Sequence, residues 1–237
     1  MSLYRATAIV VRTFKVAEAD RIAVLVTLEH GKVRAVVKGV RKTTARHGLR
    51  LEPLAHVALQ LYRGRELDTV TQVQGIDAFP AIRNDLDRLA RAAIMLEAVE
   101  MSTMDREPDP RRYQLLLGAL RALESQDRPL VVSALLLKLL ALDGVVPVLD
   151  ECTGCGRTDE LVALDPEAGG ARCRGCRSGM LLSPRGFELA RMMLGGRLVA
   201  ALNEARSPDT DGLDRVALAA TERHLERRLR AATVNTH

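Results

Sequence analysis

Aromatic side chains are scarce in this chain. Its 237 residues include no Trp, three Tyr and three Phe, and residues 1–80 hold only Tyr4, Phe14, Tyr62 and Phe79. Proteins that hold single-stranded nucleic acid usually stack bases on aromatic rings. Because some of these four rings are needed for a core, any nucleic-acid binding is expected to rely on phosphate contacts and to depend steeply on salt.

Long apolar runs and dispersed cysteines are also missing. The longest apolar run, Val131 to Leu142, is interrupted by Lys138, and the first residues show no basic stretch followed by an apolar core. A membrane-spanning helix needs about 20 apolar residues, so no membrane partner and no secretion signal are expected. All four cysteines lie within residues 152–176, unlike those of secreted disulfide frameworks. A cytoplasmic, nucleoid-associated protein is predicted.

The motifs of common enzyme classes are absent as well. No phosphate-binding Gly-x4-Gly-Lys-[Ser/Thr] loop and no Gly-x-Ser-x-Gly occurs, and no His-x-Glu signature of a zinc deaminase precedes the cysteines. Two acidic pairs could be assigned to the metal site of a nuclease, but each has a simpler interpretation. Glu97 and Glu100 are interpreted as a solvated helix edge, and Asp209 and Asp211 as a polar loop. The chain is predicted not to be an enzyme.

Basic charge is concentrated in the first third of the chain. The whole chain has 35 Lys+Arg and 30 Asp+Glu, whereas residues 1–80 have 13 basic and 7 acidic residues, a net of +6, so the remaining 157 residues sum to −1. Such asymmetry favours an electrostatic partner for this segment, either nucleic acid or an anionic membrane surface, and nucleic acid is the predicted one.

Residues 32–50, here named the cationic run, contain no Asp or Glu. Its basic residues, predicted to bind nucleic acid, are Lys32, Arg34, Lys38, Arg41, Lys42, Arg46 and Arg50. The first three occupy even-numbered positions, and side chains alternate between the two faces of a strand, so these three lie on one face for as long as the strand stays regular. The alternative is a solvated face that only keeps the protein soluble.

The first 80 residues favour a small β-barrel. Strand-like runs cover 5–13, 21–28, 32–37, 56–62 and 66–76, with a long polar connection between the third and the fourth. Five strands with this connection are typical of the oligonucleotide-binding (OB) fold. Another small barrel or an open sheet remains an alternative.

From Pro80 onward, apolar residues recur three and four positions apart, which predicts helices. An almost wholly apolar helix from Pro129 to Leu142 is expected in a core, a further helix should start at Ser183-Pro184, and a final amphipathic helix should span Ala219–Arg230. The predicted fold class is therefore α+β and multi-domain. An OB-type barrel (1–80) precedes an α-helical domain (81–150 and 181–237) that is interrupted by a small four-cysteine zinc module (151–180).

The cysteines carry the most specific motif of the sequence. Their spacing is Cys-x2-Cys-x17-Cys-x2-Cys, and the predicted metal ligands are Cys152, Cys155, Cys173 and Cys176. Four thiolates saturate a tetrahedral ion and leave no position for water, so one structural zinc per chain is predicted. A redox dithiol pair is the alternative.

Taken in order along the chain, several segments resemble the RecO family of bacterial recombination mediators. They are Tyr4–Thr13, Ala17–Arg21, Leu28–Lys32, Ala35–Arg41, Leu51–Leu54, Leu142–Gly144 with Pro147, the two Cys-x-x-Cys knuckles and Leu182–Pro184. The resemblance implies an N-terminal OB domain, a helical domain and a zinc module. It also implies binding to single- and double-stranded DNA and ATP-independent annealing of complementary strands. The implied protein partners are RecR, with which RecA is loaded, and the C-terminal tail of the single-stranded-DNA-binding protein that coats the DNA.

Two other functions fit parts of the sequence. A zinc-ribbon protein bound to RNA, or to a ribosome or polymerase surface, would use the cationic run to recognise duplex shape. A metalloenzyme is the third interpretation.

Overall fold

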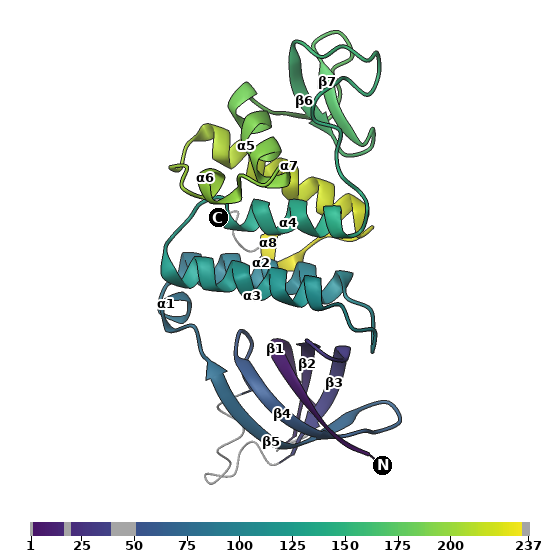
Figure 1. The fold of residues 1–237 in the computed structure, drawn as a ribbon, viewed down its shortest axis with the longest axis vertical. Helices are drawn as coiled ribbons and strands as arrows, with labels where there is room; N and C mark the ends of the chain where they lie inside the picture. The colour runs from purple at the N-terminus through teal and green to yellow at the C-terminus, as the bar shows by residue number, and fades with distance from the viewer. Residues whose placement is uncertain (1, 17–19, 39–50, 234–237) are drawn as a thin grey trace. The chain divides into compact units, whose positions relative to one another are not determined.

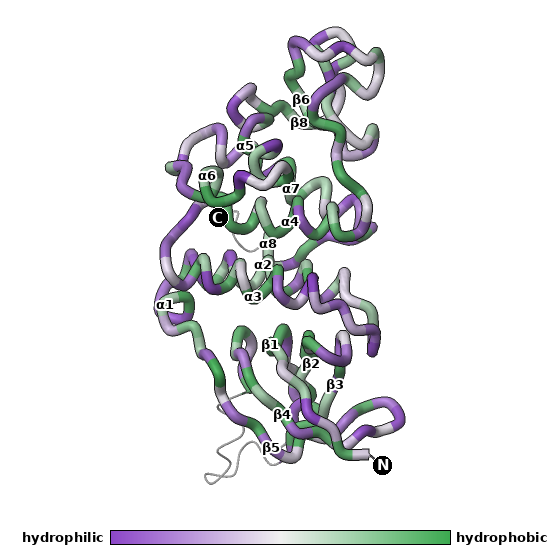
Figure 2. The backbone as a smooth tube through the Cα atoms, in the orientation of Figure 1, coloured by the Kyte–Doolittle hydropathy of each residue, from purple (hydrophilic) through white to green (hydrophobic). Residues whose placement is uncertain are grey.

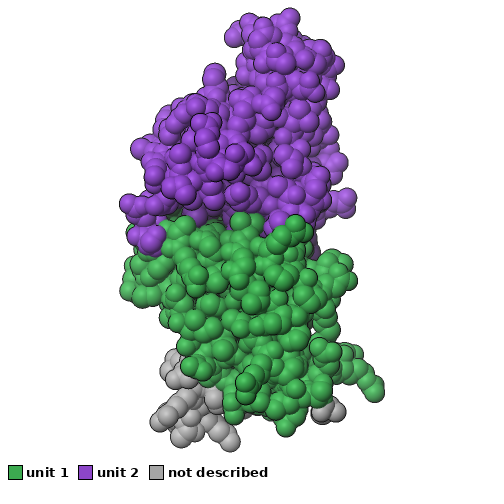
Figure 3. Space-filling view, viewed as in Figure 1, with its two compact units in different colours: residues 1–124 green, residues 125–237 purple. Residues whose placement is uncertain are grey.

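The computed structural model describes residues 2–16, 20–38 and 51–233 (Figure 1). The chain forms two compact units, residues 1–124 and residues 125–237 (Figure 3). The first helices after the strands therefore belong to the same unit as the strands. The sequence-based division at residues 80, 150 and 180 groups these helices differently and stays a prediction.

Five strands in the first unit close into a barrel: β1 (Leu3–Lys15), β2 (Arg21–Thr27), β3 (Gly31–Val37), β4 (His56–Tyr62) and β5 (Asp68–Asp77). Their order is β1-β2-β3-β5-β4, with β3 and β5 parallel and the other neighbours antiparallel. Hydropathy varies along these strands (Figure 2), because alternate side chains such as Ala8, Val10, Leu59 and Leu61 fill the barrel. The predicted five-stranded OB-type barrel is confirmed.

Three helices complete this unit: α1 (Pro80–Arg83), α2 (Leu86–Ser102) and α3 (Pro110–Ser125). Asp85 caps α2 by accepting hydrogen bonds from the N–H groups of Asp87 and Arg88, both at 3.0 Å. Glu100 of α2 pairs with Arg12 of β1 at 2.6 Å and has a side chain only 14% exposed. The interpretation of Glu100 as a solvated helix edge was therefore wrong, because periodicity could not reveal a partner 88 residues away.

Both faces of β2 are buried. Ala23 and Leu25 point into the barrel, and the alternate residues Ile22, Val24 and Val26, which point outward, are also at most 7% exposed. The outer face of this strand is consequently closed to a ligand.

The second unit contains α4 (Val131–Leu142), α5 (Pro184–Leu194), α6 (Leu198–Leu202), α7 (Pro208–His224) and α8 (Arg230–Thr233). Nine of the twelve residues of α4 are buried, which confirms it as the core helix. Ser183 caps α5 as predicted, accepting a hydrogen bond from the Gly186 N–H at 3.0 Å. Among the described residues, no helix has the length and apolarity that crossing a bilayer requires.

The predicted helix Ala219–Arg230 was placed too late in the chain. α7 starts earlier because Ser207 and Thr210 form a capping box, which satisfies the first free N–H groups of the helix. Asp209 and Asp211 lie in its first turn, where the helix dipole favours negative charge. They do not form the polar loop expected from sequence.

A three-stranded sheet holds the cysteine segment. It consists of β6 (Leu161–Asp165), β7 (Gly170–Cys173) and β8 (Met180–Leu181), in the antiparallel order β7-β6-β8. This small sheet separates α4 from α5 in the chain, as the predicted interruption of the helices requires.

Candidate metal centre and nucleic-acid interface

The four predicted ligands converge on one point. The Sγ atoms of Cys152, Cys155, Cys173 and Cys176 all lie within 4.8 Å of one another, and all four cysteines are free of disulfides. Cys155 Sγ and Cys173 Sγ are 3.7 Å apart. Four zinc–sulfur bonds of about 2.3 Å in a tetrahedron separate their sulfurs by about 3.8 Å. The cluster therefore has the dimensions of a tetrahedral thiolate site.

Backbone turns give the first knuckle its shape. The Gly156 N–H donates to the Cys152 carbonyl at 2.8 Å, and the Cys152 N–H donates to the Arg157 carbonyl at 2.7 Å. Gly156 has φ of 73°, a left-handed conformation that favours glycine. A Cβ on Gly154 would lie 2.6 Å from the guanidinium of Arg172. Gly156 is thus favoured by its backbone conformation, whereas a side chain at Gly154 would require the guanidinium of Arg172 to move.

The charges of the cluster call for a cation. N–H groups, first that of Cys173, outweigh burial and lower the pKa of the Cys152 thiol to about 6. Hydrogen bonds with Cys155 and Cys173 raise the pKa of the Cys176 thiol to about 12. Four thiols this close cannot all ionise unless a positive ion neutralises them. The donor set fits a thiolate-bound divalent ion such as zinc, and the protein fills every position of the tetrahedron, which is typical of a structural site.

Arg172 joins the second knuckle to the small sheet. Its Nε donates to the Cys176 carbonyl and to Ser178 Oγ, both at 3.0 Å. Ser178 in turn donates to Asp165, and this hydrogen bond lowers the pKa of the carboxyl. These polar contacts position the knuckle on a sheet of three short strands, whose buried apolar side chains include Ala163, Leu164 and Ala171.

The structure separates the members of the cationic run. Lys32 and Arg34 both point outward from β3, where they alternate with the buried Val33 and Ala35. Lys32 Nζ lies 3.2 Å from Asp105 Oδ1 and donates to the Glu100 carbonyl at 3.1 Å, which leaves its side chain 15% exposed. Lys32 therefore fastens β3 to the end of α2 and is poorly placed for a ligand.

Arg34 and Lys38, by contrast, are exposed. The other members of the run, Arg41, Lys42, Arg46 and Arg50, lie outside the described residues. The exposed cations thus begin on β3 and continue toward the acid-free connection that follows it.

The aromatic residues of the barrel have different environments, which the sequence could not predict. Phe79 is fully buried, and the Tyr4 hydroxyl donates to Asp68. Phe14 and Tyr62 are 41% and 45% exposed. Two aromatic rings are therefore open to solvent in spite of the scarcity of aromatic residues.

A buried carboxylate that sequence reasoning missed connects three segments of the first unit. Asp68, with a side chain 0% exposed, accepts hydrogen bonds from both guanidinium NH2 groups of Arg106, at 2.9 and 3.2 Å, and from the Gly64 N–H at 2.9 Å. Burial alone would raise the pKa of Asp68, but hydrogen bonds from Arg106 and Tyr4 hold it below its ordinary value. This network is a structural anchor between strands and helices.

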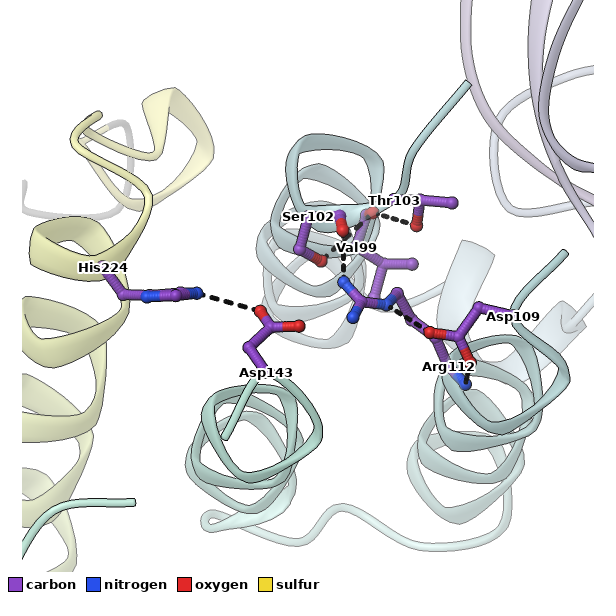
Figure 4. Close-up of polar contacts among 7 residues, drawn as sticks. All are labelled: Val99, Ser102, Thr103, Asp109, Arg112, Asp143 and His224. Atoms are coloured by element: carbon purple, nitrogen blue, oxygen red, sulfur yellow. Dashed lines mark hydrogen bonds and ion pairs between the residues drawn. The ribbon is translucent and has the colours of Figure 1, made fainter. Parts of the chain in front are cut away.

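Other polar contacts brace helix ends within each unit (Figure 4). In the first, Arg112 donates to Asp109 at 3.1 Å and to the Ser102 carbonyl at the end of α2. In the second, His224 Nε2 lies 2.9 Å from Asp143 Oδ2, which joins the end of α7 to the end of α4.

Two family models match the chain. The model described as "Recombination protein O N terminal" covers residues 1–79, and the one described as "Recombination protein O C terminal" covers residues 83–232. The gap between them falls where the barrel strands give way to α1. The resemblance noted in the sequence is confirmed, and the chain belongs to the recombination protein O family of DNA repair and recombination proteins.

Proposed function

We propose that this chain is a recombination mediator without catalytic activity of its own. It binds single- and double-stranded DNA and anneals complementary strands without ATP. With RecR, it loads RecA onto strands coated by the single-stranded-DNA-binding protein. The observation that carries the proposal is the pair of exposed cations, Arg34 and Lys38, at the start of an acid-free connection in a chain that matches the family along its length.

Annealing needs no covalent chemistry. Two complementary strands repel each other through their phosphates, and a cationic surface that is indifferent to sequence lowers that repulsion. The predicted phosphate contacts are those of the cationic run beyond Lys32, namely Arg34, Lys38, Arg41, Lys42, Arg46 and Arg50. Lys32 acts indirectly by holding β3 in place.

Zinc in the four-cysteine cluster belongs to this proposal. A bound zinc ion supplies four metal–sulfur bonds, and a small module gains folding free energy from such bonds. Cys152, Cys155, Cys173 and Cys176 hold it, and the N–H groups around Cys152 stabilise the thiolate form. The module has a structural role, with one zinc per chain.

Coated DNA also requires recruitment of the mediator. The C-terminal tail of the single-stranded-DNA-binding protein is the proposed contact, since the protein would otherwise have to compete for strands that are already covered. The tail brings the mediator to the coated strand before the cationic run engages its phosphates.

Fluorescence-quenching annealing rates, measured without nucleotide, test the proposal. Bare complementary strands should anneal faster with the protein than without it, and an Arg34→Glu/Lys38→Glu variant should lose most of the acceleration. On coated strands, deletion of the tail should slow the reaction. If bare strands anneal no faster than spontaneously, the annealing proposal fails; if tail deletion leaves the rate on coated strands intact, only recruitment fails. Stronger competition by RNA than by DNA of matched length would favour the RNA-binding alternative.

A further inference from the structure

The barrel has a second polar surface, on the outer sides of β1, β4 and β5. Strand register places three rows of outward residues across these strands: Leu3–Tyr62–Thr69, Arg5–Gln60–Gln72 and Thr7–Ala58–Gln74. The residues between them on β4, Leu59 and Leu61, are buried in the barrel core. The rows therefore stand on strands whose inner side chains are fixed by packing.

A groove of about 860 Å³ lies over the second and third rows. Ala58 contributes only a methyl group there, while Arg5, Gln60, Gln72 and Gln74 line the groove with longer side chains. This volume is at the upper end of the range for sites that hold small molecules, about 300 to 1,000 Å³. The groove is large enough for more than a single nucleoside.

The chemistry of the groove suits unpaired nucleotides. Of the residues that the structure describes, Arg5 is the only charged one that lines the groove, and none of the lining residues is a carboxylate. A glutamine amide offers both donors and an acceptor, which matches the mixed donors and acceptors of base edges. Glu29 lies at the Thr7 end, where its carboxylate accepts a hydrogen bond from the Thr7 N–H at 2.9 Å. The Arg5 side is thus the better side for a phosphate chain.

The neighbouring row adds a ring for stacking. Tyr62 is 45% exposed and follows Gln60 on the same face of β4. The exposed Arg63, Arg65 and Glu66 come next in the chain, and the Arg63 guanidinium lies 5.4 Å from the centroid of the Tyr4 ring. A base can stack on an aromatic ring whatever its identity, whereas duplex DNA keeps its bases stacked on one another. An open ring, amides and Arg5 on one face therefore favour a single strand over a duplex.

We propose that this face, here named the glutamine groove, binds a short stretch of single-stranded DNA. Tyr62 stacks on a base, the amides of Gln60, Gln72 and Gln74 bond base edges, and Arg5 contacts a phosphate. The inference rests on the proposed DNA-binding function and adds to it a surface distinct from the cationic run. Because the outer face of β2 is buried, the barrel cannot offer that strand to DNA instead.

Binding of fluorescent oligo-dT to the full chain tests the inference. Tyr62→Ala should weaken binding by about 5- to 150-fold, since stacking contributes about 1–3 kcal/mol per base. Tyr62→Phe should retain the affinity. Gln72→Ala/Gln74→Ala should weaken binding too, whereas the matched control Gln114→Ala, on the exposed face of α3, should not.

Salt dependence separates this surface from the cationic run. Arg5→Gln should make the slope of log K against log salt shallower by about 0.7, and Tyr62→Ala should leave it unchanged because no phosphate contact is lost. Urea unfolding checks that each variant is folded.

The outcomes separate the inference from the proposed function. Suppose that the wild type binds oligo-dT and that the variants Tyr62→Ala and Gln72→Ala/Gln74→Ala bind it equally well. The groove is then not a DNA site, and the proposed function stands. If the wild type does not bind, the proposed function itself fails. A groove variant that keeps its affinity for oligo-dT but no longer binds RecR would identify the groove as a protein-binding surface and overturn the inference.

Discussion

Lys32 and Arg34 lie two residues apart on the same face of β3, yet the same neutral substitution should affect them differently. Lys32 is already engaged by Asp105 and the Glu100 carbonyl, whereas Arg34 is exposed. We expect Arg34→Gln to weaken phosphate binding. Lys32→Gln should leave it nearly unchanged.

The magnitude follows from the number of cations that remain available. Setting Lys32 aside leaves six members of the cationic run, and each phosphate neutralised on a single strand contributes about −0.7 to the slope of log K against log salt. The run's part of the wild-type slope should therefore be about −4, equivalent to roughly a 300-fold loss of affinity between 50 and 200 mM salt, and a phosphate held by Arg5 adds about −0.7. Arg34→Gln should reduce the run's part of the slope to about −3.5, and Arg34→Gln/Lys38→Gln should reduce it to about −2.8.

Fluorescence anisotropy with oligo-dT over a series of KCl concentrations measures these slopes. Urea unfolding of Lys32→Gln should show a loss of up to about 1 kcal/mol, because the partner Asp105 is 61% exposed and surface ion pairs contribute little. Equal changes of slope for Lys32→Gln and Arg34→Gln would refute the assignment of Lys32 to the fold. A wild-type slope near zero would refute phosphate binding by the run altogether.

Three further predictions concern stability and metal content. Cys155→Ser should reduce the zinc content below one per chain and destabilise the module. Metal analysis of protein prepared under reducing conditions checks this. Wild-type protein that contains neither zinc nor iron and has four titratable thiols would contradict it. Arg106→Ala should destabilise the first unit by about 3 kcal/mol, since it leaves the buried Asp68 without its charged partner; a loss under 1 kcal/mol in urea unfolding would count against the anchor. Burial and the charge of Arg121 lower the pKa of His56 below 6.5 in the folded state. The folded state therefore binds fewer protons than the unfolded state below this pH. The free energy of unfolding should fall as the pH drops below 6.5, by at most about 1.4 kcal/mol per pH unit. His56→Gln should remove that part of the pH dependence, and an unchanged profile would argue against His56 as its source.

Local patterns in the sequence were enough for several features. All five strands were predicted to within two residues at each end, because runs rich in β-branched residues between turn residues are typical of strands. The start of α5 at Ser183-Pro184 was also predicted from local sequence, because a helix cap acts within one turn. The convergence of four cysteines followed from spacing alone, because two residues between cysteines bring both sulfurs of a knuckle to one ion.

Only the tertiary structure decided which side chains are available to a ligand. Lys32 and Arg34 lie on the same face of β3, but Lys32 is paired with Asp105, a residue far along the chain. Tyr62 and Phe79 are both aromatic residues near strand ends, but one is exposed and the other is buried. The glutamine groove likewise exists only because register brings residues from three strands into rows. Periodicity reports on neighbours within one strand or helix, whereas exposure depends on segments that closure of the barrel and packing of the helices bring together.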